Sequence, residues 1–358
     1  MKSIEKKLEN RVKKISDRHI SLWLTSSGIL ALFAFFDIET LKKIELWDIS
    51  DIANTVDSFA SPILGIFENN IIKVLAYVLF GIVLILRIYK SVIHPRAIVI
   101  NHSSFSNAQS AYDPNIISGQ LVKEIEINLV DQMSHHNFVD AIRLQDSLIE
   151  EVLNSCNKST ELFYYGIAHI PLIFRAGFQV GDEGNVRLLH KYRNNQSVFK
   201  EISTEPDNGV VNLKYSLIPS AASSKEMLVV IATSLPVVNE DLVAFRGGNI
   251  CCELRIEMQN KSMFGFDSVD SYAVMNRLRA VILSKIRETV VKKNIERVHL
   301  VLATSSDFTF FLAQGFSKNH DPEIIVYQYD RSNPQKYPWG ISNKALPSTA
   351  FIRQNKVE

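Results

Sequence analysis

Small hydroxyl and imidazole side chains follow several apolar runs of the chain, and these residue types suit the binding of a phosphorylated ligand. The runs 227–232 and 298–303 are each followed by Thr and Ser residues directly before a helical pattern, and residues 102–105 and 168–170 occupy equivalent places earlier. Hydroxyl residues there cap a helix and leave backbone N–H groups directed outward, which suits phosphate. The candidate ligand-binding residues are His102, Ser103, Ser104, Phe105, Tyr164, His169, Thr233, Ser234, Thr304, Ser305, Ser306, Asp307 and Phe308. For each loop taken alone, plain helix capping is the alternative.

The sequence lacks the common signatures of catalysis. It contains no GxxxxGK[ST], GxGxxG, GxSxG or HExxH motif. The chain therefore lacks the turn or the ligands that define P-loop, ordinary dinucleotide-binding, α/β-hydrolase and zincin proteins. The nine histidines do not cluster with acids, and the three cysteines lack metal-ligand spacing. We therefore expect no enzyme, no catalytic residue, no metal and no cofactor.

The charge balance of the chain restricts the kinds of partner that it can bind. With 39 Lys+Arg against 38 Asp+Glu, the formal net charge is +1, which argues against a protein that coats DNA or RNA polymers. A hydrophobic content of 46% excludes general disorder, and 358 residues allow about two compact domains.

The elements that position the candidate loops are those of an α/β domain with a largely parallel sheet. Short apolar runs alternate with helical patterns from residue 97 onward, which predicts two halves, 97–225 and 226–358. Open α/β sheets bind ligands at the carboxyl ends of their strands. Expected strands are 97–101, 124–130, 162–167, 185–191, 227–232, 251–258, 298–303 and 323–329, and expected helices include 138–154, 237–246, 269–293 and 306–317.

Two parts of this domain have distinctive patterns. Residues 251–258 alternate between apolar and charged side chains, so we expect an edge strand there, whereas the continuous apolar runs should form the sheet centre. The polar, turn-rich stretch 192–225 is expected to be a junction between the halves.

Residues 1–96 have the character of a membrane region. Residues 20–36 are uncharged and nearly all apolar, and residues 70–89 have an apolar centre, so we expect two spanning helices with a short external loop at 37–69. Basic residues before the first span and after the second predict that both termini face the cytoplasm of a bacterium, across its inner membrane. Membrane lipid is then a partner. Buried core helices, or a signal peptide for the first run, are the alternatives.

The carboxy-terminal third resembles a known family. The run 297–315 (RVHLVLATSSDFTFFLAQG), then 324–329 (IIVYQY) and 337–341 (YPWGI), resembles the end of a SAVED domain, the sensor module of effectors in cyclic-oligonucleotide-based anti-phage signalling systems (CBASS). The run 164–171 (YYGIAHIP) and the long helix 269–293 are similar to the same family, so the resemblance covers about residues 97–345. Ser305 and Ser306 stand where many relatives carry a proline.

This resemblance implies two fused CARF-like Rossmann-type halves that hold a cyclic di- or trinucleotide made by a cognate nucleotidyltransferase. The phosphates are expected at residues 233–234 and 304–307, with bases stacked on Phe105, Tyr164 or Phe308. Binding would drive homo-oligomerisation and cluster the two spans, and the disrupted membrane would cause abortive infection without turnover of a substrate.

Two other functions remain open at this stage. A membrane-tethered nuclease could cleave the cyclic nucleotide, using Ser or Thr residues or His102 to position it. A membrane scaffold could instead bind a protein partner and no nucleotide.

Overall fold

The computed structural model describes residues 96–354, apart from 107–110, 118–121, 157–159, 183–185, 193–197, 208, 210, 221 and 247–248. The expected spans at 20–36 and 70–89 and the loop between them therefore lie outside the described residues. Among the helices that are described, none combines the length and the apolar character that crossing a membrane requires. Residues 94–358 form one compact unit.

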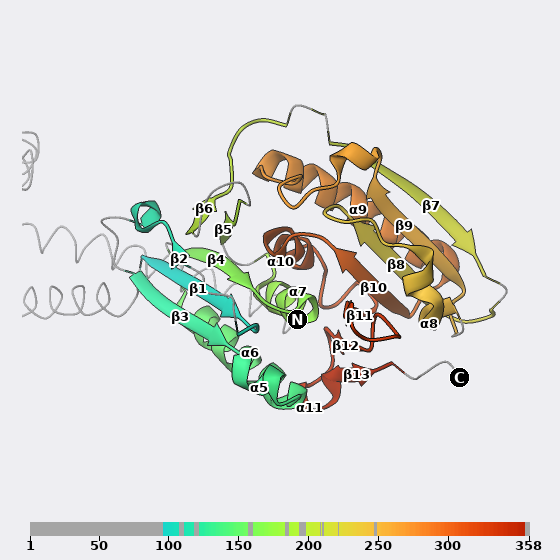
Figure 1. Ribbon diagram of the computed structural model, residues 1–358, viewed down its shortest axis with the longest axis horizontal. Helices are drawn as coiled ribbons and strands as arrows, with labels where there is room; N and C mark the ends of the chain where they lie inside the picture. The colour runs from blue at the N-terminus through green and yellow to red at the C-terminus, as the bar shows by residue number, and fades with distance from the viewer. Residues whose placement is uncertain are drawn as a thin grey trace, which may run out of the picture. The chain divides into compact units, whose positions relative to one another are not determined.

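The first sheet has six strands in the order β2-β6-β5-β4-β1-β3 (Figure 1). Its strands are β1 (Ala97–Ser103), β2 (Ala111–Tyr112), β3 (Val122–Asn128), β4 (Glu161–Ile167), β5 (Val186–His190) and β6 (Val198–Glu201). The helices among them are η1 (Pro114–Ile117), α5 (Val130–Ser134), α6 (Phe138–Ser155) and α7 (Ile170–Val180).

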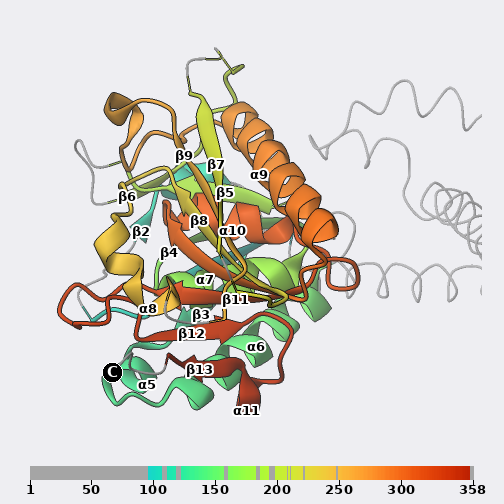
Figure 2. The same cartoon turned by 90° about the vertical axis from the view of Figure 1, so that its right-hand side faces the viewer.

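The second sheet has seven strands in the order β13-β12-β11-β10-β8-β9-β7. Its strands are β7 (Leu213–Pro219), β8 (Glu226–Ala232), β9 (Cys252–Met258), β10 (Arg297–Ala303), β11 (Glu323–Gln328), β12 (Trp339–Ser342) and β13 (Phe351–Arg353). Its helices are η2 (Asn239–Leu242), α8 (Val243–Arg246), η3 (Lys261–Met263), α9 (Tyr272–Lys293), α10 (Ser306–Gln314) and α11 (Pro347–Ala350). Helix α9 lies along this sheet beside β7 (Figure 2).

The two halves repeat one arrangement. In the first, β1 pairs in parallel with β3 and β4, and β4 with β5; in the second, β8 pairs in parallel with β9 and β10, and β10 with β11. From β1 the chain crosses to β3, its neighbour on one side, and then to β4, its neighbour on the other side. From β8 it crosses in the same way to β9 and then to β10. Each half therefore has a switch point, between β1 and β4 and between β8 and β10, where such sheets bind ligands. The prediction of an α/β fold with largely parallel strands is confirmed, and the strands form two sheets, the second of which includes β7 from before residue 226.

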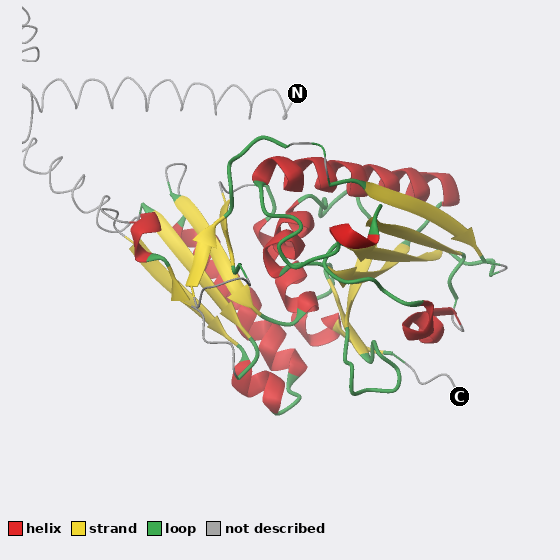
Figure 3. Ribbon diagram, turned by 45° about the horizontal axis from the view of Figure 1, so that its top comes forward, coloured by secondary structure: helices red, strands yellow, loops and turns green. Residues whose placement is uncertain are grey.

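Helices α7 and α10 join the halves. They lie between the two sheets, which form separate groups of strands (Figure 3). Both helices are buried over nearly their whole length: most of their residues are apolar, and the buried Arg175 of α7 and Asp307 of α10 are paired within the protein. A Cβ atom at Gly177 of α7 would lie 2.3 Å from the carbonyl oxygen of Phe310 in α10, so only glycine allows this close approach. The hydrophobic core continues through this contact, from Ile98 in the first half to Ile341 in the second.

Three expectations about individual elements are wrong. Strand β9 lies between β8 and β7, so residues 251–258 are not an edge. The edge strand β7, and β6 of the first sheet, both fall in the stretch 192–225 that we expected to be a junction. In addition, residues 237–246 form the short helices η2 and α8 in place of one longer helix.

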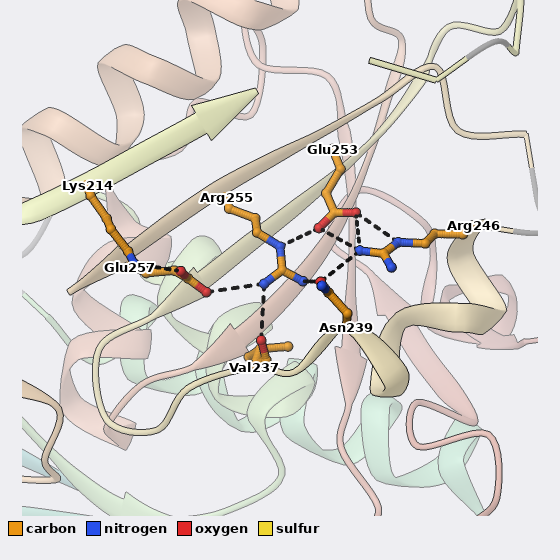
Figure 4. A network of polar contacts seen from close by, with 7 residues as sticks. All are labelled: Lys214, Val237, Asn239, Arg246, Glu253, Arg255 and Glu257. Atoms are coloured by element: carbon orange, nitrogen blue, oxygen red, sulfur yellow. Dashed lines mark hydrogen bonds and ion pairs between the residues drawn. The ribbon is translucent and has the colours of Figure 1, made fainter. Parts of the chain in front are cut away.

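The wrong expectation of an edge strand at residues 251–258 has a physical explanation. The charged side chains on one face of β9 are covered by the segment 237–246 and paired within a polar network (Figure 4). The Glu253 carboxylate accepts hydrogen bonds from Arg246 and Arg255, and Asn239 bridges the two guanidinium groups. The alternation in the sequence thus reflects buried ion pairs, not contact with solvent.

Candidate functional site

The first switch point brings two predicted loops together. Ser103 at the end of β1 lies beside Ile167 at the end of β4, which places Ser104 against His169. The Ser104 hydroxyl accepts a hydrogen bond from the His169 backbone N–H at 2.8 Å and lies 2.6 Å from Nδ1 of the same residue. The Phe105 ring stacks on the His169 ring with their centroids 4.1 Å apart.

A segment of the second half completes this site. The first amide of α7, that of Ile170, donates a hydrogen bond to the side-chain oxygen of Gln328 at the end of β11, at 3.0 Å. Trp339 at the start of β12 lies near His169, with the ring centroids 5.7 Å apart. The amino terminus of α7 therefore faces residues of both halves.

A cavity of about 330 Å³ opens at this place. It is lined by Phe105, Met133, His136, Phe138, His169, Gln328, Tyr329, Asp330, Arg331 and Trp339. Of the predicted residues, Phe105 and His169 line the cavity. The sequence reasoning missed the others, although Asp330 and Arg331 directly follow the expected strand 323–329, as the predicted loops follow theirs.

The cavity offers flat rings and little net charge. Burial lowers the pKa of His169 to about 4, so its imidazole is neutral at physiological pH. Hydrogen bonds from Ser332 lower the pKa of Asp330, whose carboxylate stays ionised. Arg331 is exposed and supplies a positive charge. Four aromatic rings with one guanidinium group suit the stacking of a base beside a phosphate.

Three other predicted residues belong to the interior. His102 is fully buried, with Nδ1 3.0 Å from the Tyr164 hydroxyl, and burial lowers its pKa to about 3. The Tyr164 ring stacks on Phe310 at 3.8 Å, and burial raises the pKa of its hydroxyl. Phe308 is also fully buried. Tyr164 and Phe308 therefore present no free ring face for a base, whereas Phe105 is 40% exposed.

The second switch point is closed by its own backbone. The N–H groups of Thr233 and Ser234 both donate to the carbonyl oxygen of Ala303, at 3.0 and 2.9 Å. The Thr304 hydroxyl lies 2.6 Å from that of Thr309. The structure thus brings the loops after β8 and β10 together as predicted, but these two amide donors are already used. Ser305 is the N-cap residue of α10, and Ser306 is its first residue.

A buried ion cluster holds the start of α10 to the first half. His190, at the end of β5, has Nδ1 3.1 Å from the Asp307 carboxylate and Nε2 2.9 Å from the Asp267 carboxylate. Burial alone would lower the pKa of His190, but the hydrogen bonds and charges of Asp307 and Asp267 outweigh it and raise the pKa to about 9. Asp307 is therefore paired within the protein and is less suited to contact phosphate.

This cluster makes stability depend on pH. The pKa of His190 is raised from 6.5 on folding, so its contribution is fully present below pH 6.5 and is lost as pH rises through 9. Relative to His190→Gln, we expect the wild-type free energy of unfolding to fall by up to about 3 kcal/mol across this window. Urea unfolding of both proteins at each pH measures the difference. A difference that does not change with pH would contradict a charged His190.

One family model matches more than half of the chain. A family model described as "SAVED: SMODS-associated and fused to various effectors sensor domain" matches residues 144–342. A search of curated proteins found no match. Within the part of the chain that the structure describes, no group of three or more His, Cys, Asp or Glu side chains could hold a metal ion.

Several solved structures are similar to the chain. One is the Acinetobacter baumannii Cap4 SAVED/CARF-domain containing receptor with the cyclic trinucleotide 2'3'3'-cAAA, at 13% identity and a TM-score of 0.49, covering 77% of this chain and 56% of that one. The same receptor with 3'3'3'-cAAA matches at 14% identity and a TM-score of 0.47, with the same coverage. The Moraxella osloensis Cap4 receptor matches at 13% identity and a TM-score of 0.38, covering 63% of this chain and 47% of that one. The chain thus spans about half the length of these receptors.

Proposed function

The chain belongs to the SAVED family of sensor domains, and from this premise we propose that its α/β part binds a cyclic di- or trinucleotide. The cavity at the start of α7 is the proposed binding site. The nucleotide would act as a signal made by a cognate nucleotidyltransferase in anti-phage defence. No substrate is turned over in this proposal, so the bound ligand is released unchanged.

One observation carries the location of the site. The cavity joins the first switch point to the end of β11, so a ligand there contacts both halves at once. Its volume of about 330 Å³ is at the lower end of the range for ligand sites, about 300–1,000 Å³. We therefore expect one base with its phosphate to enter the cavity and the rest of the ring to lie outside.

Different residues of the cavity would bind the base and the phosphate of the ligand. Phe105, which covers one face of the His169 ring, is the aromatic residue that would stack on the base. Arg331 would pair with a phosphate, because guanidinium groups bind phosphate oxygens through two parallel hydrogen bonds. The predicted contacts at 233–234 and 304–307 are less favoured, because amide donors of the first loop and the carboxylate of Asp307 are already paired.

Calorimetric titration of the full-length chain in detergent, with a panel of cyclic di- and trinucleotides, tests this site. For the ligand that binds, Phe105→Ala is expected to weaken the affinity about 5- to 150-fold, which corresponds to the loss of about 1–3 kcal/mol of stacking. Arg331→Ala is expected to weaken binding and to reduce its dependence on salt.

The control is Arg143→Ala, which removes an arginine of α6 whose side chain is 62% exposed and pairs with Asp140. Wild-type affinity is expected for this variant. If Phe105→Ala and Arg331→Ala bind the same ligand as tightly as the wild type, the site lies elsewhere. If no nucleotide of the panel binds, the sensor proposal itself fails.

We further propose that the sensor controls a membrane region. In this proposal residues 1–96 form the membrane region, with spans at 20–36 and 70–89, and the halves 97–225 and 226–358 lie in the cytoplasm of a bacterium. The ligand would drive homo-oligomerisation, and the clustered spans would disrupt the inner membrane and cause abortive infection. Loss of membrane potential in cells that express the wild type with the ligand, but not Phe105→Ala, supports this. Retention of the potential with a bound ligand contradicts it.

A further inference from the structure

Cys251 and Cys252 place two sulfur atoms side by side at the start of β9. Successive side chains of a strand point to opposite faces, but Cys251 lies in a bend before the strand begins. The two Sγ atoms are consequently only 3.7 Å apart. Cys251 is partly exposed, whereas Cys252 is buried.

The backbone holds this arrangement in place. The Cys251 N–H donates to the carbonyl oxygen of Glu226 at 2.8 Å, and the Cys251 carbonyl accepts from the Ser220 N–H at 2.9 Å. Cys252 pairs with Met227 of β8 and with Pro219 of β7. Both cysteines are therefore held between two strands of the sheet, β8 and β7.

The distance fits two sulfurs bound to one atom better than a disulfide bond. A disulfide needs its sulfurs about 2.0 Å apart, which would require the backbone to move. Two sulfurs bound to one atom stay farther apart than a bond length. From the observed contact of 3.7 Å, rotation of the two side chains is enough to bring both sulfurs onto one atom.

The surroundings restrict which atom could bridge the pair. Zinc in structural sites takes four ligands, and the described residues contain no group of three or more candidate ligands. Burial, followed by the neighbouring Cys251 thiol, raises the pKa of Cys252 to about 12, so Cys252 is a neutral thiol at physiological pH. The bridging atom must therefore be satisfied by two sulfurs and must react with a neutral thiol.

Trivalent arsenic in an organic arsenical meets both conditions. We propose that Cys251 and Cys252 form a vicinal dithiol site that captures trivalent organoarsenicals. With phenylarsine oxide, two As–S bonds form, the As=O bond and both S–H bonds break, and the oxygen leaves with both protons as one water. Arsenic remains trivalent, so no oxidant or reductant is needed. The exposed Cys251 reacts first, and closure onto Cys252 is then intramolecular.

Treatment of the full-length chain with one equivalent of phenylarsine oxide tests the site. Intact-mass spectrometry is expected to show one phenylarsenic group in place of two thiol hydrogens. The number of titratable thiols in the unfolded, treated chain should fall from three to one, because the sequence contains three cysteines. The adduct should survive an excess of a monothiol, which competes poorly with a chelating pair, and should be removed by 2,3-dimercaptopropanol.

Two variants make the result specific. Cys156→Ser, which removes the remaining cysteine, is expected to bind the arsenical as the wild type does. Cys251→Ser is expected to lose the monothiol-resistant adduct. This variant carries the test because Cys251 is partly exposed, whereas replacement of the buried Cys252 can prevent folding. A resistant adduct on Cys251→Ser, or its loss in a correctly folded Cys156→Ser, would overturn the proposal.

Discussion

Replacing Arg175 by alanine is expected to lower the free energy of unfolding by about 3–5 kcal/mol. Arg175 of α7 is buried and binds the Asp146 carboxylate through two hydrogen bonds, at 2.8 and 2.5 Å. It also donates to the carbonyl oxygens of Ser342 and Ala345, at 2.7 and 3.0 Å. Its removal leaves a mostly buried carboxylate without its partner and two carbonyl groups without their donor.

Urea unfolding followed by far-UV circular dichroism measures this loss. The matched control is Arg143→Ala in α6, because the Arg143–Asp140 pair is exposed and contributes at most about 1 kcal/mol. A loss of less than 1 kcal/mol for Arg175→Ala would mean that this cluster does not hold the two halves together.

Replacing Glu253 by alanine is expected to cost a similar amount, about 3–5 kcal/mol, because it breaks a buried ion pair. The Glu253 carboxylate is buried between the guanidinium groups of Arg246 and Arg255 (Figure 4). Without it, two like charges remain on either side of Asn239, and Arg255 keeps Glu257 as its charged partner. The segment 237–246 should then be held less firmly on β9.

The control for this network is Lys214→Ala. Lys214 is 59% exposed and lies 3.8 Å from the Glu257 carboxylate, so its loss should change stability by at most about 1 kcal/mol. Hydrogen exchange of the amides in 237–246 gives a second readout and should become faster in Glu253→Ala. Equal stability of the two variants would contradict a structural role for Glu253.

Much of the architecture was predictable because parallel sheets leave a strong pattern. The buried strands β8, β10 and β11 are continuous apolar runs, and the structure has them at nearly the expected residues. The carboxyl ends of neighbouring parallel strands meet at one edge, so the contacts of Ser104 with His169 and of Thr233 with Ala303 follow from the strand order. The positions of these strands and the contacts at their carboxyl ends depend only on the local sequence pattern and on the order of the strands.

The rest depends on how the two halves pack, which no local pattern encodes. The second wall of the cavity comes from Gln328 to Arg331 and from Trp339, and it meets the first only because α7 packs on α10. Phe310 of α10 stacks on Tyr164 of β4, so a ring that the sequence offered for stacking on a base is part of the core. The two membrane spans lie outside the described residues and stay predictions.

The hydrogen bonds of Arg175 also bear on how the protein is made. They join residues that are 167 and 170 positions apart in the sequence, so α7 is synthesised long before its partners at Ser342 and Ala345. When the ribosome has completed the strands of the first half, it has not yet produced the segment with Ser342 and Ala345 that Arg175 binds. Until then Arg175 has only Asp146 as a partner, and the apolar faces of the first half that pack on the second are uncovered, which is the kind of surface that chaperones bind. A chain that stops before residue 342 could not form the hydrogen bonds from Arg175 to Ser342 and Ala345.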